Sequence, residues 1–230
     1  MRRFVRAAFV DRVPRDHTQP DAQFRRRRVV AAVTLVVGAL LLGLSLSIRP
    51  GDALFYPMTL AVAATWVAGA FLSGPLHLGR ILFRDTLRRP VVTPILTGLL
   101  AGAVFIAGSL VVREIPPLRA STDEVLDHAR YGSIVLITVV TLANGAAEEL
   151  FFRGALFAAV GRTLPVTIST VVYALATVAT GNPMLVFAAV VLGTVLALQR
   201  RASGGVLAPV LTHVTWSTVM LFALPPLIAN

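Results

Sequence analysis

Long runs of apolar residues dominate the pattern of hydrophobic and polar positions along the chain. Each run holds roughly 16 to 30 residues, and about 20 are enough for a helix to cross the hydrocarbon core of a bilayer. The predicted spans are residues 29–48, 52–72, 91–112, 131–160, 165–180, 183–198 and 205–224. We therefore predict an all-α fold, a polytopic bundle of about seven transmembrane helices.

The polar segments between the spans divide the chain into three parts. Residues 1–28 form a basic tail, and residues 29–112 hold the first three spans with a basic surface loop. Residues 131–224 form the core of the bundle. The loop at 113–130 is mixed in charge and is predicted to lack a span.

Two of the polar segments have helical spacing. In the tail, apolar residues at Phe4, Val5, Ala8 and Phe9 alternate with arginines, which fits either a short interfacial helix or a disordered basic tail. In the basic loop 73–90, arginines at 80, 84 and 88 recur at every fourth position. This spacing predicts a helix that lies on the membrane surface.

The composition supports lipid as the solvent of this chain. Hydrophobic residues make up 56% of the 230 positions and charged residues only 14%, which is too little to form the polar surface of a soluble domain. There is no cysteine, so disulfides and thiolate metal sites are excluded. The net charge of +10 lies beside the hydrophobic spans, where it fits contact with membrane lipids and not with nucleic acid.

The distribution of arginine predicts the orientation. With a cytoplasmic N-terminus and seven spans, 17 of the 21 arginines fall in cytoplasmic segments. This bias agrees with the positive-inside rule. We therefore expect an integral, multi-pass protein of the cell membrane, with its N-terminus in the cytoplasm and its C-terminus outside.

Glu148 and Glu149 are the only acidic residues in the interior of a predicted span, since Asp52 marks the start of the span 52–72 and the other acids lie in the tail or loops. An ionised carboxylate in hydrocarbon is costly, so such residues face a protein interior or a wet cavity and usually serve function. Glu149 and Arg153 are four residues apart and are predicted to pair along one helix face. Glu148 points about 100° away and has no such partner. It is a candidate general base for activating water, or else makes a structural hydrogen bond.

His213 is the only histidine within a predicted span, whereas His17, His77 and His128 lie in the tail or loops and are predicted to be solvated. It lies about two helical turns from the cytoplasmic end of its span. Glu148 also lies towards that end, so both side chains could reach one cavity facing the cytosol. The alternative role for His213 is a hydrogen bond between helices.

These residues carry a resemblance to a known family. The segment 148–154, EELFFRG, resembles the EExxxRG motif of the CPBP family of CAAX-prenyl-protease and bacteriocin-processing (Abi) membrane proteins. The segment 192–213, LGTVLALQRRASGGVLAPVLTH, resembles the run that leads to the last histidine of that family. The resemblance covers residues 131–224. It implies a helical bundle around a conical cavity open to the cytosol, and endoproteolysis by a water that a glutamate activates.

Residue by residue, the resemblance implies a general base at Glu148, a supporting pair in Glu149 and Arg153, and the last histidine in His213. Two positions depart from the family pattern. Thr177 stands where the FxxxH motif has its histidine, and Ser217 stands where the last motif has asparagine or aspartate. Both hydroxyls are candidates for oxyanion stabilisation or substrate binding.

Zinc is the cofactor that the resemblance raises, with His213 and Glu148 as candidate ligands. A catalytic zinc usually has three nitrogen, oxygen or sulfur ligands from the protein. This chain offers one imidazole and two carboxylates, one of them predicted to pair with Arg153. We therefore expect no tight metal binding.

Three functions remain open. The first is a membrane-embedded endopeptidase, a hydrolase that cleaves a peptide or lipidated peptide near the cytosolic leaflet. The second is a catalytically impaired relative that binds peptides or partner proteins, as a scaffold or as an immunity-type protein. The third is a transporter with a proton relay through Glu148 and His213, although no inverted repeat supports it.

Overall fold

The computed structural model describes residues 2–14, 18–83 and 86–228. The helices are α1 (Arg2–Val5), α2 (Asp21–Leu46), α3 (Phe55–Ser73), α4 (Val92–Val112), α5 (Pro116–Arg130), α6 (Ile134–Glu149), α7 (Phe157–Val160), α8 (Pro165–Val178), α9 (Pro183–Ser203) and α10 (Leu207–Ile228). Two π-helical segments, η1 (Arg6–Val10) and η2 (Leu150–Leu156), continue α1 and α6, and β1 (Ile81–Phe83) pairs with β2 (Thr86–Arg88). The fold is therefore all-α, as predicted, apart from one small hairpin.

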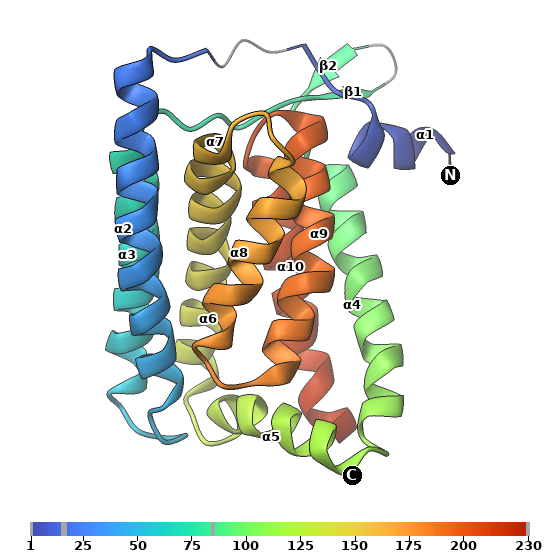
Figure 1. The fold of residues 1–230 in the computed structure, drawn as a ribbon. Helices are drawn as coiled ribbons and strands as arrows, with labels where there is room; N and C mark the ends of the chain where they lie inside the picture. Colours follow the sequence, from blue (N-terminus) through green and yellow to red (C-terminus); the bar gives the residue numbers. More distant parts are fainter. Residues whose placement is uncertain (1, 15–17, 84–85, 229–230) are drawn as a thin grey trace.

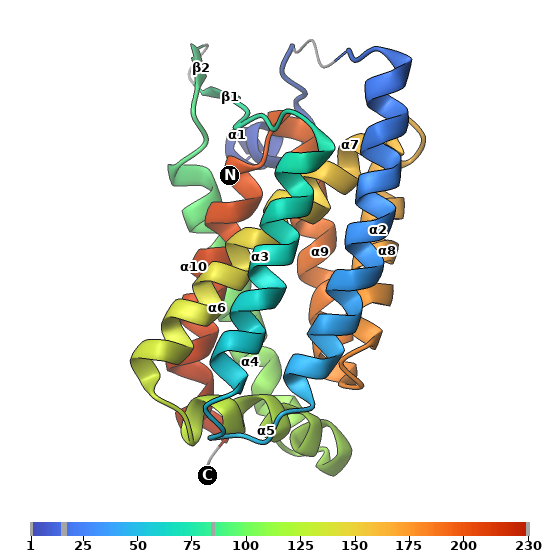
Figure 2. The same ribbon diagram turned by 90° about the vertical axis from the view of Figure 1, so that its left-hand side faces the viewer.

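Long helices run side by side along one axis to form the bundle (Figure 1). Six of them are long and apolar enough to cross a membrane: α2, α3, α4, the continuous helix Ile134–Val160, α9 and α10. Helix α5 lies across one end of the bundle, and the N-terminal segment, the hairpin and α7 lie at the other end (Figures 1 and 2). The chain is a multi-pass membrane protein.

Helix α8 is the exception among the predicted spans. It is apolar and runs beside α9, but it has only 14 residues. At 1.5 Å per residue it is about 21 Å long, shorter than the hydrocarbon core of about 30 Å. The predicted fifth span, 165–180, therefore corresponds to a short helix that packs beside α9, and the described residues contain six helices long enough to cross the membrane.

Small and polar residues face inward on the outer helices, and large aliphatic residues face outward. On α4 the buried positions are Thr93, Pro94, Thr97, Gly98, Gly102 and Ser109. On α2 the exposed positions include Val29, Val33, Val36, Leu40 and Leu44. Small inward residues let membrane helices approach closely, and lipid tails solvate the aliphatic side chains. This arrangement explains why the apolar runs are long and why polar residues do not recur in them at helical spacing.

Glycines set the close approach of α2 to α3. A Cβ atom on Gly38 would overlap the indole ring of Trp66, which is fully buried. Across the same interface, a Cβ atom on Gly69 would overlap the side chain of Thr34. Each glycine therefore leaves the space that a side chain of the other helix fills, and this allows α2 and α3 to pack closely.

The G38A variant is expected to lower the free energy of unfolding by about 1–3 kcal/mol, because the added methyl group overpacks the α2–α3 interface. The measurement is denaturant unfolding of the purified protein in detergent micelles. The matched control is G108A on α4, where an added Cβ meets no atom within 4 Å. Equal unfolding midpoints for G38A and G108A would contradict this packing.

Two surface predictions were wrong. The predicted surface helix in the basic loop is an antiparallel hairpin in which Leu82 pairs with Leu87. The β-branched and bulky residues of Ile81–Phe83 favour a strand over the helix that the arginine spacing indicated. Residue 84 lies outside the described residues.

The predicted loop 113–130 contains α5, which begins with prolines at its first two positions. His128 is not solvated, because it is buried on this helix and its Nε2 lies 3.1 Å from the carbonyl oxygen of Ile48. His77 is half-buried, and His17 lies outside the described residues. In the basic tail, a short helix is present as α1 and η1, and α2 already begins at Asp21.

A backbone contact orders the turn between α9 and α10. The amides of Val206 and Leu207 donate to the carbonyl oxygens of His77 and Leu78, at 2.8 and 3.1 Å. Gly204 ends α9 with a φ of 72°, the left-handed conformation that glycine adopts most easily. The loop before the hairpin therefore holds the start of α10, the helix that carries His213.

Candidate active site

Glu148 and Glu149 are the last two residues of α6, and the helix continues beyond them as the π-helical segment η2. A π-helical turn inside a long helix is rare and occurs often at functional sites. Twelve residues separate Glu148 from the end of this helix at Val160, about 18 Å at 1.5 Å per residue. The pair therefore lies inside the bundle and not at its surface.

Glu149 is fully buried and its Oε1 atom joins two neighbours. The Nη1 atom of Arg153 donates to it at 2.9 Å, so the predicted pairing along the helix is present. The Nδ1 atom of His213, on α10, also lies 2.9 Å from Oε1. An ionised carboxylate only accepts hydrogen bonds, so Nδ1 carries the proton of that bond. Glu149 thereby fixes the orientation of the imidazole ring.

Arg153 is also fully buried and is held from three sides. Besides Glu149, its guanidinium donates from Nη2 to the carbonyl oxygen of Gly193, at 3.0 Å, and stacks over the ring of Tyr173. A Cβ atom on Gly193 would lie only 2.9 Å from Nη2. Gly193 therefore makes the space that the guanidinium occupies between α6, α8 and α9.

Glu148 has a different environment. It is half-buried, and the hydroxyl of Tyr173 donates to its Oε2 atom at 2.6 Å. The other carboxylate oxygen, Oε1, has no hydrogen bond among the described residues. It can therefore accept a hydrogen bond from a water or a substrate. The two adjacent acids thus differ, because Arg153 and His213 enclose Glu149, whereas Glu148 has one oxygen without a hydrogen bond among the described residues.

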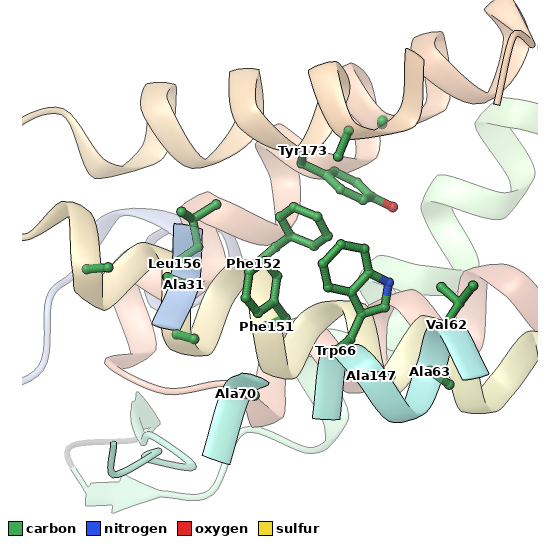
Figure 3. Packing of buried hydrophobic residues seen from close by; sticks show 14 residues of the cluster. Ala31, Val62, Ala63, Trp66, Ala70, Ala147, Phe151, Phe152, Leu156 and Tyr173 are labelled. Carbon is green, nitrogen blue, oxygen red and sulfur yellow. The ribbon is translucent and has the colours of Figure 1, made fainter. Parts of the chain in front are cut away.

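Aromatic rings hold Tyr173 in position. Tyr173 packs on Phe152, with ring centroids 4.6 Å apart, and Phe151 stacks on Trp66 at 4.7 Å. Figure 3 shows these side chains, from α8, η2 and α3, gathered into one cluster. Offset aromatic contacts of this kind stabilise a fixed geometry beyond the area they bury. The phenol is therefore placed by rigid packing.

Thr177 and Ser217 are both buried, and no hydrogen bond joins either hydroxyl to a carboxylate in the described chain. The Thr177 hydroxyl donates to the carbonyl oxygen of Tyr173, one turn earlier on α8. Ser217 lies one turn after His213 on α10, and no hydrogen bond of its hydroxyl is found in the described chain. In this structure the hydroxyl of Thr177 thus donates its hydrogen bond to the backbone of its own helix.

The structure brings four predicted site residues together: Glu148, Glu149, Arg153 and His213. His213 on α10 makes a hydrogen bond to Glu149 on α6, which is the contact between helices that the sequence offered as its alternative role. Tyr173 was missed as a partner of Glu148. Its position one turn before Thr177 on an apolar helix offered a signal, but only the packing of α8 against α6 reveals the contact.

The donor set does not fit a zinc ion. No group of three histidine, cysteine, aspartate or glutamate side chains converges on a common point in the described ranges. Glu149 Oε1 is committed to Arg153 and His213, and the adjacent guanidinium charge opposes a cation. The remaining donors, Glu148 and His213, fall short of the three ligands that zinc usually takes. We therefore derive the chemistry from the side chains alone.

The fold and these contacts define a class: a multi-pass membrane protein with a buried cluster of two carboxylates, a guanidinium and an imidazole. Residues 130–219 match the family described as type II CAAX prenyl endopeptidase Rce1-like. This part of the chain is a domain of that family, and it contains every residue of the cluster. A comparison with curated proteins found no match, and a comparison with solved structures found none either.

Proposed function

We propose that this protein is a membrane-embedded endopeptidase in which Glu148 activates a water to hydrolyse a peptide bond near the cytosolic leaflet. One observation supports this most: the hydroxyl of Tyr173 donates to Oε2 of Glu148 beside the Glu149 cluster, and the other carboxylate oxygen has no hydrogen bond among the described residues. The family domain supports a peptide as the substrate class. A lipidated peptide suits a site that lies within the membrane-spanning helices.

The proposed reaction starts with proton transfer from a water to Oε1 of Glu148. The water oxygen adds to the carbonyl carbon of the peptide bond, and the carbonyl oxygen becomes an oxyanion. A protonated His213, held by Glu149, donates from Nε2 to this oxyanion. When the carbon–nitrogen bond breaks, the proton on Glu148 passes to the leaving amine. Arg153 balances the charge of Glu149 throughout.

The test is cleavage of a panel of prenylated and unmodified peptides by the purified protein in lipid nanodiscs. The expected products are a shortened peptide and a released tail, and in water enriched with oxygen-18 the new carboxylate carries the label. Mass spectrometry measures both. The E148Q variant is the control. Unlabelled products, or equal cleavage by E148Q, would overturn the proposed role of Glu148.

A second candidate is a catalytically impaired family member that binds peptides or partner membrane proteins. It is favoured by the contact of Thr177, whose hydroxyl donates to its own helix and not towards Glu148. In that case the wild-type protein binds the same peptides without cleaving them. The T177H/S217N variant, which restores the family pattern, then gains hydrolysis.

A further inference from the structure

A cavity of about 970 Å³ lies at the end of the bundle that also holds the N-terminal segment and α7. Several parts of the chain form its walls: the residues before α2, the start of α2, the loop after α3, the segment from η2 through α7 to the start of α8, and the end of α9. Glu148, Glu149, Tyr173 and His213 are not among the lining residues. This cavity is therefore separate from the candidate active site.

The walls of the cavity are basic. Arg12, Arg162, Arg200 and Arg201 line it together with His77, and the lining residues that the structure describes include no acid. The start of α8 also lines the cavity, and no side chain caps that helix terminus. Helix N-termini carry partial positive charge and free amides, which adds to the attraction of an anion.

Arg27 strengthens this charge from behind the wall. It is fully buried, and its guanidinium donates to Oε1 of Gln19 and to the carbonyl oxygen of Pro75, both lining residues. No acid pairs with it in the described ranges, and its Nη1 atom is buried without a hydrogen-bond partner. A buried guanidinium without an anion is costly, which favours a ligand that supplies negative charge nearby.

The pKa of His77 also indicates a positive potential in the cavity. Burial lowers the pKa of this ring below its ordinary value, and the charges of Arg200 and Arg27 lower the pKa further. Neighbouring cations have this effect because they oppose a second positive charge. The cavity therefore favours an anion over a cation or a neutral polar group.

The position of the cavity narrows the choice of anion. It opens at the ends of membrane-spanning helices, the level at which lipid phosphates lie. Its walls also include apolar surface from Phe24, Phe157 and Leu164. Arginine matches phosphate oxygens with two parallel hydrogen bonds, and it does so better than lysine, which this chain lacks.

We propose that this cavity binds a phosphate group, and that its source is the headgroup of an anionic phospholipid. The bound phosphate contacts Arg12, Arg162 of the α7–α8 turn and the arginines at the end of α9. The inner wall includes Gly154, and Nε of Arg200 donates to the carbonyl oxygen of Arg153 at 2.6 Å. The site therefore adjoins the helix that carries the candidate active site without being part of it.

The test uses the full chain in a neutral detergent, titrated with short-chain phosphatidylglycerol and, separately, with inorganic phosphate. Native mass spectrometry and isothermal titration calorimetry measure binding. Arg12 and Arg162 are exposed, so the R12Q/R162Q variant should fold normally. The matched control is R49Q/R113Q, the same charge change at the opposite end of the bundle.

Saturable binding of one phosphatidylglycerol is expected, with affinity lowered about tenfold for each lost guanidinium contact in R12Q/R162Q and unchanged in R49Q/R113Q. Equally tight binding of inorganic phosphate alone would support the phosphate site and reject the lipid as its source. No saturable binding of either probe, or an equal loss of affinity in the R49Q/R113Q control, would overturn the proposal.

Discussion

Replacing Arg153 by methionine is expected to lower the free energy of unfolding by about 3–5 kcal/mol, the usual cost of removing one partner of a buried ion pair. Both side chains of the pair are fully buried, and Glu149 Oε1 lies 2.9 Å from Nη1. Without the guanidinium, the carboxylate keeps only its hydrogen bond to His213. The R153M variant should therefore unfold at a much lower denaturant concentration in detergent micelles.

Two further variants separate the ion pair from the loss of side-chain volume. The E149Q/R153M double variant should recover part of the loss, because a neutral amide leaves no uncompensated buried charge. The exposed ion pair of Arg113 and Glu114 supplies the control, where R113M should cost less than about 1 kcal/mol. Equal destabilisation by R153M and R113M is the result that the buried pair does not allow.

The membrane-spanning helices could be predicted from the sequence because their physical signal is long and simple. An apolar run of about 20 residues has few alternatives to a spanning helix, since every backbone polar group must be satisfied internally. The predicted span 91–112 corresponds to α4 (Val92–Val112), and 52–72 corresponds to α3 (Phe55–Ser73). Prolines and glycines mark most of the ends.

The short amphipathic segments could not be predicted in the same way. In the basic loop, arginines at every fourth position fit a helix, but the intervening Ile81–Phe83 fits a strand equally well. Helix α5 lies across the end of the bundle and packs few apolar residues, Leu126 among them. Tertiary contacts decide such segments, and a single sequence does not contain those contacts.

In the candidate site, too, the contacts within one helix could be predicted and the contacts between helices could not. The contact between Glu149 and Arg153 is local to one helix, so their spacing of four residues predicts it. The contacts of Glu148 with Tyr173 and of Glu149 with His213 join residues 25 and 64 positions apart. They depend on how α6, α8 and α10 pack. The motif therefore names the acids, and the fold assigns their partners.

The contacts between helices also separate the roles of the two adjacent acids, Glu148 and Glu149. Helical geometry predicts only that they point in different directions. The packing adds that one is enclosed by Arg153 and His213, whereas the other has a single phenol donor. Substitutions of the two acids should therefore have different consequences: a change at Glu149 affects folding and the orientation of His213, and a change at Glu148 affects chemistry.

The E148Q variant is expected to lower kcat for peptide hydrolysis by about 100- to 10,000-fold, the usual contribution of a general base. Glutamine retains the shape of the side chain and still accepts a hydrogen bond from Tyr173, but it takes no proton from water. Unfolding in detergent should be almost unchanged. The matched control is E124Q on α5, which alters an acid hydrogen-bonded to Asn182 far from the site.

Tyr173 distinguishes a positioning role from a purely structural one. The Y173F variant removes the hydroxyl that donates to Glu148 and should lower kcat about 10- to 100-fold, because a hydrogen bond to a charged group is lost. The control is Y56F, where the hydroxyl accepts from the amide of Ser133. If the phenol positions the base, Y173F lowers kcat with little change in KM or in the free energy of unfolding, and Y56F changes none of the three. An unchanged kcat in Y173F would contradict this role.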